Sequence, residues 1–493
     1  MSIQDKAWSV PFAKDITMRF GVEQELHATA GVLRDLDWAT RSFKAEGGVT
    51  YRSELGEGSA LRAVSFGEDH FELYGVPGNL ARFELAPHGS AASDPASLQA
   101  RRINVLGAEE LEATGSVHVS VRGQDRSFEL DSHTAHLAIG TSLAGEPAPF
   151  RIEATLVTNS LVGQPNRTTR IIGRDLAIEG AFLRSDEESV VTRSTVVVKG
   201  QVQADVTGDV TLTGAGETFT MAEDGTARLE TEPDLKVSTW GRLAGTSHPY
   251  EMTADWIEFG DQALEAENPR IFVNAALLPI APTPGVEPQA AFTEAMAQRL
   301  YADEAGLSLE GDVRVEGTDG TGAVLVIESR SLLLAGDVNY VSTGGAWLTA
   351  FDSLEAWGGF EVNYAGKARS TGERLLLTEE TALLTGSPAR AELDEFVFES
   401  GRIKIDLERF LIETQAGKLM GRSGEGSRDW TLAYSLMRPF ERDGETMLLI
   451  RSPVYTEGSL VGRAGWAVCW LDGEAWREYG RATLFGSDAE SRP

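Results

Sequence analysis

The feature that most constrains this fold is an internal repeat at a fixed offset. A shift of 311 residues aligns Phe43–Asn79 with Leu354–Arg390 without a gap, and 8 of the 37 aligned pairs are identical, where average composition would give about two. The identical pairs are Ala45/Ala356, Gly47/Gly358, Gly48/Gly359, Ser59/Ser370, Glu68/Glu379, Leu73/Leu384, Gly75/Gly386 and Pro77/Pro388. Because glycine and proline restrict where a backbone can turn, the match predicts a structural unit that occurs more than once.

Apolar and polar residues alternate over long runs, which is typical of strands that are buried on one face. Leu111 to Val121 and Leu307 to Val315 alternate without a break, and in Leu354 to Tyr364 only Trp357 departs from the pattern. The run from Val196 to Gly214 would extend about 60 Å at roughly 3.3 Å per residue, beyond the usual strand length. It therefore predicts a bend at Gly200 or Gly208.

The composition excludes several functions. The 493 residues carry a net charge of −31 and no basic run, so nucleic-acid binding is not expected. The single cysteine, Cys469, excludes an internal disulfide framework and a cysteine-based zinc site, and its apolar surroundings favour a buried hydrophobic role. The chain has neither an apolar run of transmembrane length nor the apolar core of a signal peptide near its start. It is therefore expected to be cytoplasmic, or to begin after an export signal or anchor.

A proline-rich stretch divides the chain. It contains Pro279, Pro282, Pro284 and Pro288, and it predicts a linker. The following residues, from about Pro288 to Asp303, predict the one helix of the chain. Its apolar face would comprise Ala291, Phe292, Ala295, Met296 and Leu300. The predicted domains are an N-terminal module at 1–140, a second module at 141–278, the linker and helix at 279–304, a C-terminal module at 305–421 and an aromatic-rich closing cap at 422–493.

Residues with catalytic or metal-binding chemistry are sparse. His133 and His136, near Asp131, would point to opposite faces of a strand, so they cannot chelate one ion. The carboxylate pairs Glu187-Glu188, Glu379-Glu380 and Asp394-Glu395 are sequential and would diverge. No nucleophile elbow, phosphate-binding loop or zinc-protease motif is present. The sequence predicts neither an enzyme nor a cofactor or metal.

With these units in view, the chain resembles the lipopolysaccharide-transport bridge family, namely the OstA-like domains of LptA, LptC and the N-terminal part of LptD. The closest passage is Glu355 to Gly417, where an opening strand, a hairpin, a Gly-x-Pro stop and a further strand follow in the family's order. The Gly-x-Val-type segments that carry the resemblance are Gly48-Val49, Gly115-Ser116-Val117, Gly208-Asp209-Val210 and Gly311-Asp312-Val313. The Gly-x-Pro stops are at Gly75, Gly163 and Gly386, with a degenerate copy at Asn268-Pro269.

The resemblance implies an all-β fold, an extended β-jellyroll (β-taco) array of OstA-like repeats, in this chain with one short inserted helix. It implies a periplasmic, non-catalytic bridge or carrier that moves lipopolysaccharide or another acylated lipid towards the outer membrane along an apolar groove. Other Lpt-type bridge proteins would join by edge-strand stacking. The residues expected to line the groove are Val49, Tyr51, Val117, Val119, Val210, Leu212, Val313, Val315, Phe360 and Val362. The chain departs from the family in its length, its inserted helix and its lack of an LptC-type anchor.

Two alternatives stay open. A parallel β-helix acting on polysaccharide, as an enzyme or adhesin, would repeat about every 20 to 25 residues, and the spacing of the glycine segments in this chain is longer and irregular. A structural envelope scaffold would share the fold and carry no ligand. In that case the apolar faces would close into an ordinary sandwich core.

Overall fold

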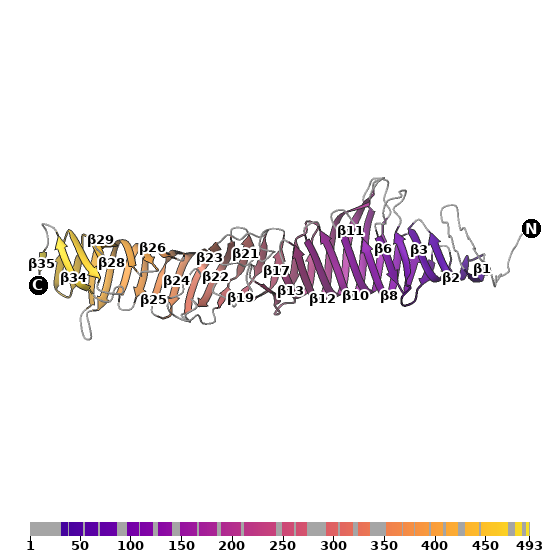
Figure 1. Ribbon diagram of the computed structural model, residues 1–493, viewed down its shortest axis with the longest axis horizontal. Coiled ribbons are helices and arrows are strands. Elements are labelled where there is room, and N and C mark those ends of the chain that lie inside the picture. The colour runs from indigo at the N-terminus through magenta and orange to yellow at the C-terminus, as the bar shows by residue number, and fades with distance from the viewer. Residues whose placement is uncertain are drawn as a thin grey trace, which may run out of the picture. The chain divides into compact units, whose positions relative to one another are not determined.

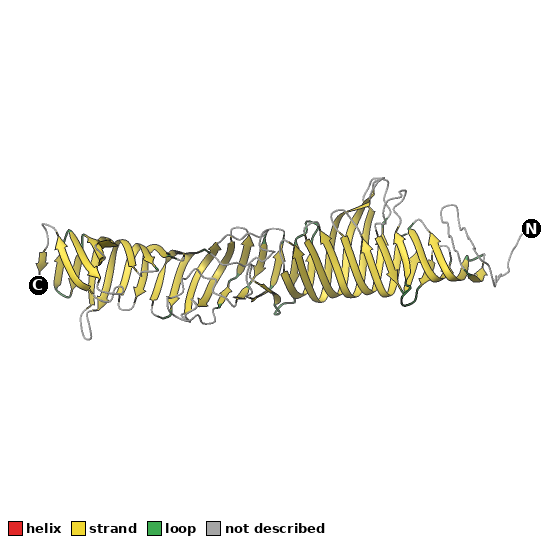
Figure 2. Ribbon diagram, viewed as in Figure 1, coloured by secondary structure: helices red, strands yellow, loops and turns green. Residues whose placement is uncertain are grey.

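The structure is a computed structural model of the chain. It describes residues 31–37, 39–52, 55–67, 70–85, 96–107, 109–121, 127–140, 148–164, 167–184, 189–208, 212–242, 249–260, 263–273, 292–303, 306–318, 324–335, 352–366, 368–378, 380–393, 396–407, 411–422, 429–442, 445–471, 479–485 and 490–492. Over these ranges the regular structure is strand and contains no helix (Figure 2). The all-β prediction is therefore confirmed.

The chain divides into two compact units. The first comprises Met1–Thr239 with Glu258–Asp261, and the second comprises Trp240–Ile257 with Gln262–Pro493. The strands of the first half of the chain are β1 (Val32–Asp37), β2 (Ser42–Arg52), β3 (Gly56–Phe66), β4 (His70–Tyr74), β5 (Ala81–Leu85), β6 (Ala96–Ala100), β7 (Arg102–Leu106), β8 (Glu110–Val121), β9 (Ser127–Ile139), β10 (Ala148–Gln164), β11 (Arg167–Arg184), β12 (Ser189–Gly208), β13 (Leu212–Met221), β14 (Ala227–Glu230), β15 (Val237–Arg242), β16 (Pro249–Ala254) and β17 (Trp256–Phe259). Those of the second half are β18 (Leu264–Glu267), β19 (Arg270–Val273), β20 (Thr293–Met296), β21 (Arg299–Asp303), β22 (Gly306–Thr318), β23 (Val324–Ala335), β24 (Ser353–Tyr364), β25 (Ala368–Thr378), β26 (Thr381–Leu393), β27 (Phe396–Asp406), β28 (Leu411–Arg422), β29 (Asp429–Arg442), β30 (Glu445–Arg451), β31 (Val454–Glu457), β32 (Leu460–Arg463), β33 (Trp466–Leu471), β34 (Tyr479–Phe485) and β35 (Glu490–Arg492).

Strands that follow one another in the sequence are mostly neighbours in the sheet. In the first unit β8, β9, β10, β11, β12 and β13 pair in succession, and in the second unit β22 to β29 do the same (Figure 1). The strands in both of these series pair antiparallel. Hairpins of this kind need only short connections, and they disagree with the parallel β-helix considered from the sequence.

The long strands bend at a bulge near their middle. In β8 the register shifts between Thr114 and Val117, so that Gly115 and Ser116 together oppose a single residue of β9, His133. Both bulged residues have left-handed backbone torsions, with φ of +79° and +55°. Two residues opposed to one bend a strand and increase its local twist. We call the line of these bulges the crease.

The same device recurs in both units. The bulged residues are Gly47-Gly48 in β2, Gly200-Gln201 in β12, Gly311-Asp312 in β22 and Gly358-Gly359 in β24. The two copies of the repeat at offset 311 therefore contain the bulge at the same position, Gly47-Gly48 in one copy and Gly358-Gly359 in the other. The Gly-x-Pro segment of the repeat also interrupts regular pairing in both copies. Gly75 to Pro77 lies between β4 and β5, and Gly386 to Pro388 lies at the register shift of β26.

Bending at the crease folds the first unit into two layers. Layer A contains β4, β7 and the β8 segment from 110 to 114, and layer B contains β5, β6 and the β8 segment from 117 to 121. The layers face each other, since the ring of Tyr51 in layer B lies 4.6 Å from that of Phe71 in layer A. Side chains from both layers thus form one core between them.

The second unit is folded in the same way. Layer C contains β19, β20 and the β22 segment from 313 to 318, and layer D contains β18, β21 and the β22 segment from 306 to 310. Side chains meet across the interior of this unit too. The Thr414 hydroxyl of layer D donates a hydrogen bond to the Tyr434 hydroxyl of layer C at 2.8 Å.

One expectation needs correction, and two others are met. The helix predicted from Pro288 to Asp303 is absent from its described part, 292–303, which forms β20 and β21 instead. Its apolar residues also fit a strand, and pairing with β19 and β22 buries Ala295 to 4% exposure, so tertiary contacts override local propensity. The bend in β12 lies at Gly200, as predicted, whereas Gly208 ends the strand. The Gly-x-Pro stop at Gly163 also lies where it was predicted, because β10 ends at Gln164 beside the β10–β11 hairpin.

Candidate functional site

The candidate site is the apolar interior between the layers, where most of the predicted lining residues lie. In the first unit Val49, Tyr51, Val117 and Val119 belong to layer B, and none is more than 6% exposed. Leu212 begins β13, and Val210 lies outside the described residues. The four layer B side chains are therefore enclosed by their neighbours.

In the second unit the predicted residues lie in layer C. Val313, Val315 and Phe360 are at most 5% exposed, whereas Val362, two residues further along β24, is only half-buried. Its cross-strand partners are Ile327 on one side and the small residue Ser370 on the other. The interior is thus more accessible at this position than at the other predicted residues of layer C.

The residues predicted to line the groove omit the facing layer in each unit, although the alternating runs of the sequence include Leu111 and Leu309. Opposite the predicted residues of the first unit lie layer A side chains such as Leu111 and Leu137, both at most 2% exposed. In the second unit the corresponding side chains are those of layer D, for example Leu309 and Leu332, both at 0%. The available signal was strand length, because a strand with a bulge in its middle supplies apolar residues to both sides of the fold.

The interior contains few polar groups. Ser160, Thr169 and Ser132 are buried in the first unit, and the Thr169 hydroxyl has no hydrogen-bond partner among the described residues. In the second unit the Thr414–Tyr434 pair is buried, and burial raises the pKa of Tyr434 to about 12. An interior of this composition can accept apolar chains, and it has few groups with which to bind a polar or charged molecule.

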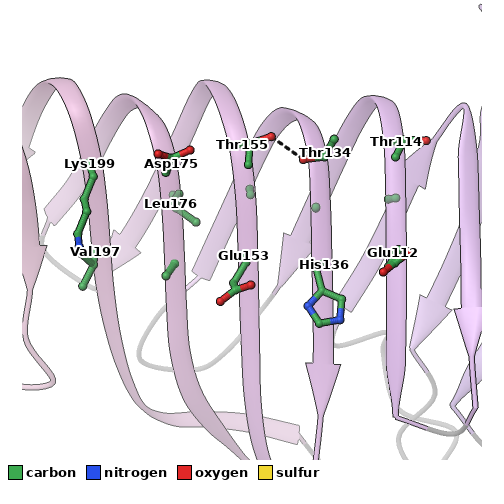
Figure 3. A pocket seen from close by; sticks show the side chains of 14 residues that line it. Glu112, Thr114, Thr134, His136, Glu153, Thr155, Asp175, Leu176, Val197 and Lys199 are labelled. Carbon is green, nitrogen blue, oxygen red and sulfur yellow. Dashed lines mark hydrogen bonds between the residues drawn. The ribbon is translucent and has the colours of Figure 1, made fainter.

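A second feature is a shallow hollow on the outer surface of layer A (Figure 3). It encloses about 530 Å³ and crosses β8 to β12 just beside the crease. Outward side chains form two cross-strand rows over it. One row is Glu112, His136, Glu153, Ala177 and Val197, and the other is Thr114, Thr134, Thr155, Asp175 and Lys199.

The hollow has hydrogen-bonding groups and no aromatic wall. The hydroxyls of Thr134 and Thr155 lie 2.6 Å apart, and Nε2 of His136 lies 3.8 Å from a carboxylate oxygen of Glu110. Among the described residues no group of three or more His, Cys, Asp or Glu side chains could hold a metal ion. The hollow therefore combines a few hydrogen-bonding groups with a mainly apolar lining, and its described residues form no evident catalytic arrangement.

The other candidate residues from the sequence are dispersed. Asp131 pairs with His118 across the ladder, Nδ1 to Oδ1 at 2.8 Å, whereas His133 lies at the crease. Of the carboxylate pairs, Glu187-Glu188, Asp394-Glu395 and Glu379 lie outside the described residues. Cys469 is half-buried, and burial raises the pKa of its thiol, which disfavours the reactive thiolate.

The described part of the chain contains no helix long and apolar enough to cross a membrane. No protein-family model matches the chain. The curated proteins likewise contain no match to it.

Proposed function

We propose that this protein is a non-catalytic carrier that holds the acyl chains of a lipid between its layers. The observation that carries the proposal is the uninterrupted row of inward apolar residues in each unit. In layer D it runs through Leu300, Leu309, Leu332, Ala356, Leu375 and Leu384. Each methylene transferred from water to such an interior contributes about 0.8 kcal/mol, so a long acyl chain gains enough to be held in water.

Access to the interior does not require the sheet to break. The ladder hydrogen bonds run between neighbouring strands of the same layer, and the layers meet through side chains. Parting them would expose apolar surface at about 25 cal/mol per Å², and an entering acyl chain would cover that surface again. An entering acyl chain would make its first contact with the interior at the half-buried Val362.

The proposal includes the finer features implied by the resemblance in sequence. The fold would be a β-jellyroll of OstA-like repeats, the cargo lipopolysaccharide or a related acylated lipid, and the compartment the periplasm. Neighbouring bridge proteins would add to the sheet through its edge strands, since an edge presents unpaired backbone groups. The lipid would move towards the outer membrane along this path.

A second candidate is a structural scaffold without a ligand. It is favoured by the enclosure of Val117, Val119, Val313 and Val315, which resembles a packed core. The two candidates differ in one measurable property. A carrier keeps lipid at its inward positions, and a scaffold keeps none.

The test is photo-crosslinking in cells with a short diazirine side chain at inward and outward positions of one strand. Val362 and Asn363 are adjacent in β24, and Val119 and His118 are adjacent in β8; one-residue steps reverse the face of a strand. We expect lipid on Val362 and Val119 and none on Asn363 and His118. Equal capture at both faces, or no lipid at either face and none in native mass spectra, would reject the carrier.

A further inference from the structure

Each layer has a rim, by which we mean the strand ends that lie away from the crease. In the first unit the described inward residues beside both rims are enclosed. Val121, Phe128 and Val162 form one cross-strand row at the rim of layer B and are at most 2% exposed. Ile139 and Phe150 are cross-strand neighbours at the rim of layer A and are at most 7% exposed. The interior of the first unit is therefore covered at these positions of both rims.

The two rims of the second unit differ from each other. The inward row at the rim of layer D is at most 7% exposed in four successive strands, at Leu334, Leu354, Leu377 and Ala382. It becomes half-buried only in the next strand, at Ile405. The inward row at the rim of layer C is half-buried in four successive strands, at Tyr364, Ala368, Leu393 and Phe396. The interior is thus more accessible along the rim of layer C than along the described parts of the other three rims.

Aromatic rings line this accessible rim of layer C. The rings of Phe396 and Trp430 lie 6.2 Å apart, edge to face, and the ring of Tyr455 lies 6.0 Å from that of Trp430. Trp430 points inward, because it has the same parity in β29 as the buried Tyr434. Gly421 makes room for it, since an added Cβ at Gly421 would lie 2.6 Å from the Trp430 ring. The three rings are half-buried, so they form an aromatic row between the interior and the surrounding water.

This aromatic row is almost free of charge. Among the described residues, the inward positions at the rim of layer C carry one charged side chain, Glu457, which is the cross-strand neighbour of Trp430. The Tyr455 hydroxyl donates a hydrogen bond to the Glu457 carboxylate at 2.9 Å. From Tyr364 to Trp430 the row is uncharged. It therefore offers aromatic and apolar contact, and it does not select for the charge of a ligand.

We propose that the aromatic row positions the junction between the acyl chains and the headgroup of the bound lipid. This inference rests on the proposed carrier function, and it adds the orientation of the lipid and its place of entry. A headgroup enclosed in the interior would lose its hydrogen bonds to water, and few polar groups there could replace them. Trp and Tyr rings favour the boundary between apolar and hydrated regions. Phe396, Trp430 and Tyr455 are thus positioning residues for a lipid whose headgroup stays in water beside the rim of layer C.

The test locates two parts of a probe lipid on the full chain. The probes are phosphatidylglycerols that carry a diazirine either next to the glycerol or at the end of one acyl chain, and peptide mass spectrometry maps the adducts. We expect the diazirine next to the glycerol to modify Phe396 or Trp430, and the terminal diazirine to modify Phe360 or Met437, which are buried nearer the crease. If the first probe instead modifies the rim of layer D, at Leu377, or if both probes give the same map, the inference fails and the carrier stands. No adduct in the interior with either probe overturns both.

Matched variants test the part played by the rings. Phe396→Ala and Trp430→Ala remove inward rings at the rim, whereas Phe272→Ala and Trp357→Ala remove rings that are 45% and 37% exposed on the outer surfaces. We expect each rim variant to weaken phosphatidylglycerol binding about two- to tenfold, the range for one aromatic contact, and the outer variants to leave it unchanged. The adducts next to the glycerol should also spread away from the rim in the rim variants, which a loss of stability alone would not cause. Equal losses in rim and outer variants, or an unchanged adduct map, overturn the positioning role.

Discussion

Substitution of the two glycines in the bulge of β24 tests how closely the neighbouring strands approach at the crease. Gly358 and Gly359 are adjacent in the bulge of β24, with φ of +81° and +96°. An added Cβ at Gly358 would lie 2.9 Å from Cβ of Arg330, whereas at Gly359 nothing lies within 4 Å. Alanine at either position meets an unfavourable backbone conformation, which costs about 1–2 kcal/mol for an L-residue. Only Gly358→Ala adds a steric conflict with the neighbouring strand.

The conflict is with an atom fixed to the backbone, so relief requires the strands to shift. Overpacking of this kind typically costs about 1–3 kcal/mol. We therefore expect a loss of about 1–2 kcal/mol for Gly359→Ala and about 2–4 kcal/mol for Gly358→Ala in the free energy of unfolding. The measurement is urea unfolding followed by circular dichroism. Because Arg330→Gly removes the opposing Cβ, Gly358→Ala should cost less in that background. Equal losses for both alanine variants, with no coupling to Arg330, would refute the close approach.

Two further predictions concern buried hydroxyls. Burial raises the pKa of Tyr434 to about 12, above the ordinary value of 10.0. The contribution of the neutral hydroxyl to the free energy of unfolding is therefore complete below pH 10 and is lost as the pH rises through 12, at about 1.4 kcal/mol per pH unit. Difference titration of tyrosinate absorbance against Tyr434→Phe measures this, and ionisation near pH 10 would contradict it. The Thr169 hydroxyl is buried without a partner among the described residues, so Thr169→Val should stabilise the first unit by about 1 kcal/mol in urea unfolding. A destabilised Thr169→Val would mean that the hydroxyl has a partner after all.

Alternation predicted which residues are buried in some strands and failed in others. In β8, Leu111 and Ala113 precede the crease and Val117 and Val119 follow it, all on odd positions and all buried. Because the bulge contains two residues, the buried residues before and after it are all odd-numbered, so their parity is unchanged. The strand therefore looks like one unbroken alternation in the sequence. The same holds for Leu354 and Phe360 on either side of Gly358-Gly359.

The neighbouring strands change parity, because each has one residue where the bulged strand has two. In β9 the buried residues are Leu130 before the crease and Leu137 after it, an even and an odd position on either side of His133. No single period fits such a strand. For this reason the segment of Asp131, His133 and His136 looks like a polar cluster in the sequence, although it is the part of β9 that lies at the crease.

Glycines in the sequence mark the bulges, where the parity of the buried residues changes between neighbouring strands. At the first bulged position, Gly115, Gly200, Gly311 and Gly358 each lie close to a long side chain, Arg101, Arg174, Gln298 and Arg330 respectively. Arg174 and Arg330 belong to the adjoining strands β11 and β23, whereas Arg101 lies between β6 and β7 and Gln298 lies between β20 and β21. At the second position Ser116, Gln201 and Asp312 adopt φ between +49° and +55°, which residues other than glycine can tolerate. A Gly-x-Val segment inside an alternating run thus marks a crease. Gly208-Asp209-Val210 has the same pattern at a strand end, so the motif alone is insufficient.

Parity also decides what the fold can contain. A strand that keeps its parity across the crease directs the same alternate residues inward in both layers, as Leu309 and Val315 do in β22. Its neighbours reach the same result by switching parity, as Ile327 and Leu332 do in β23. If every strand kept its parity or every strand switched it, the two-against-one register of the bulges could not be met, and half of the inward positions would carry polar residues. Where the two strand types alternate, as in β8 and β9 and from β22 to β25, both layers are apolar on their facing sides. From β25 to β28 every strand switches parity, as Leu384 and Ala389 do in β26, and the facing sides are still apolar because the register shift of β26 differs from a two-against-one bulge.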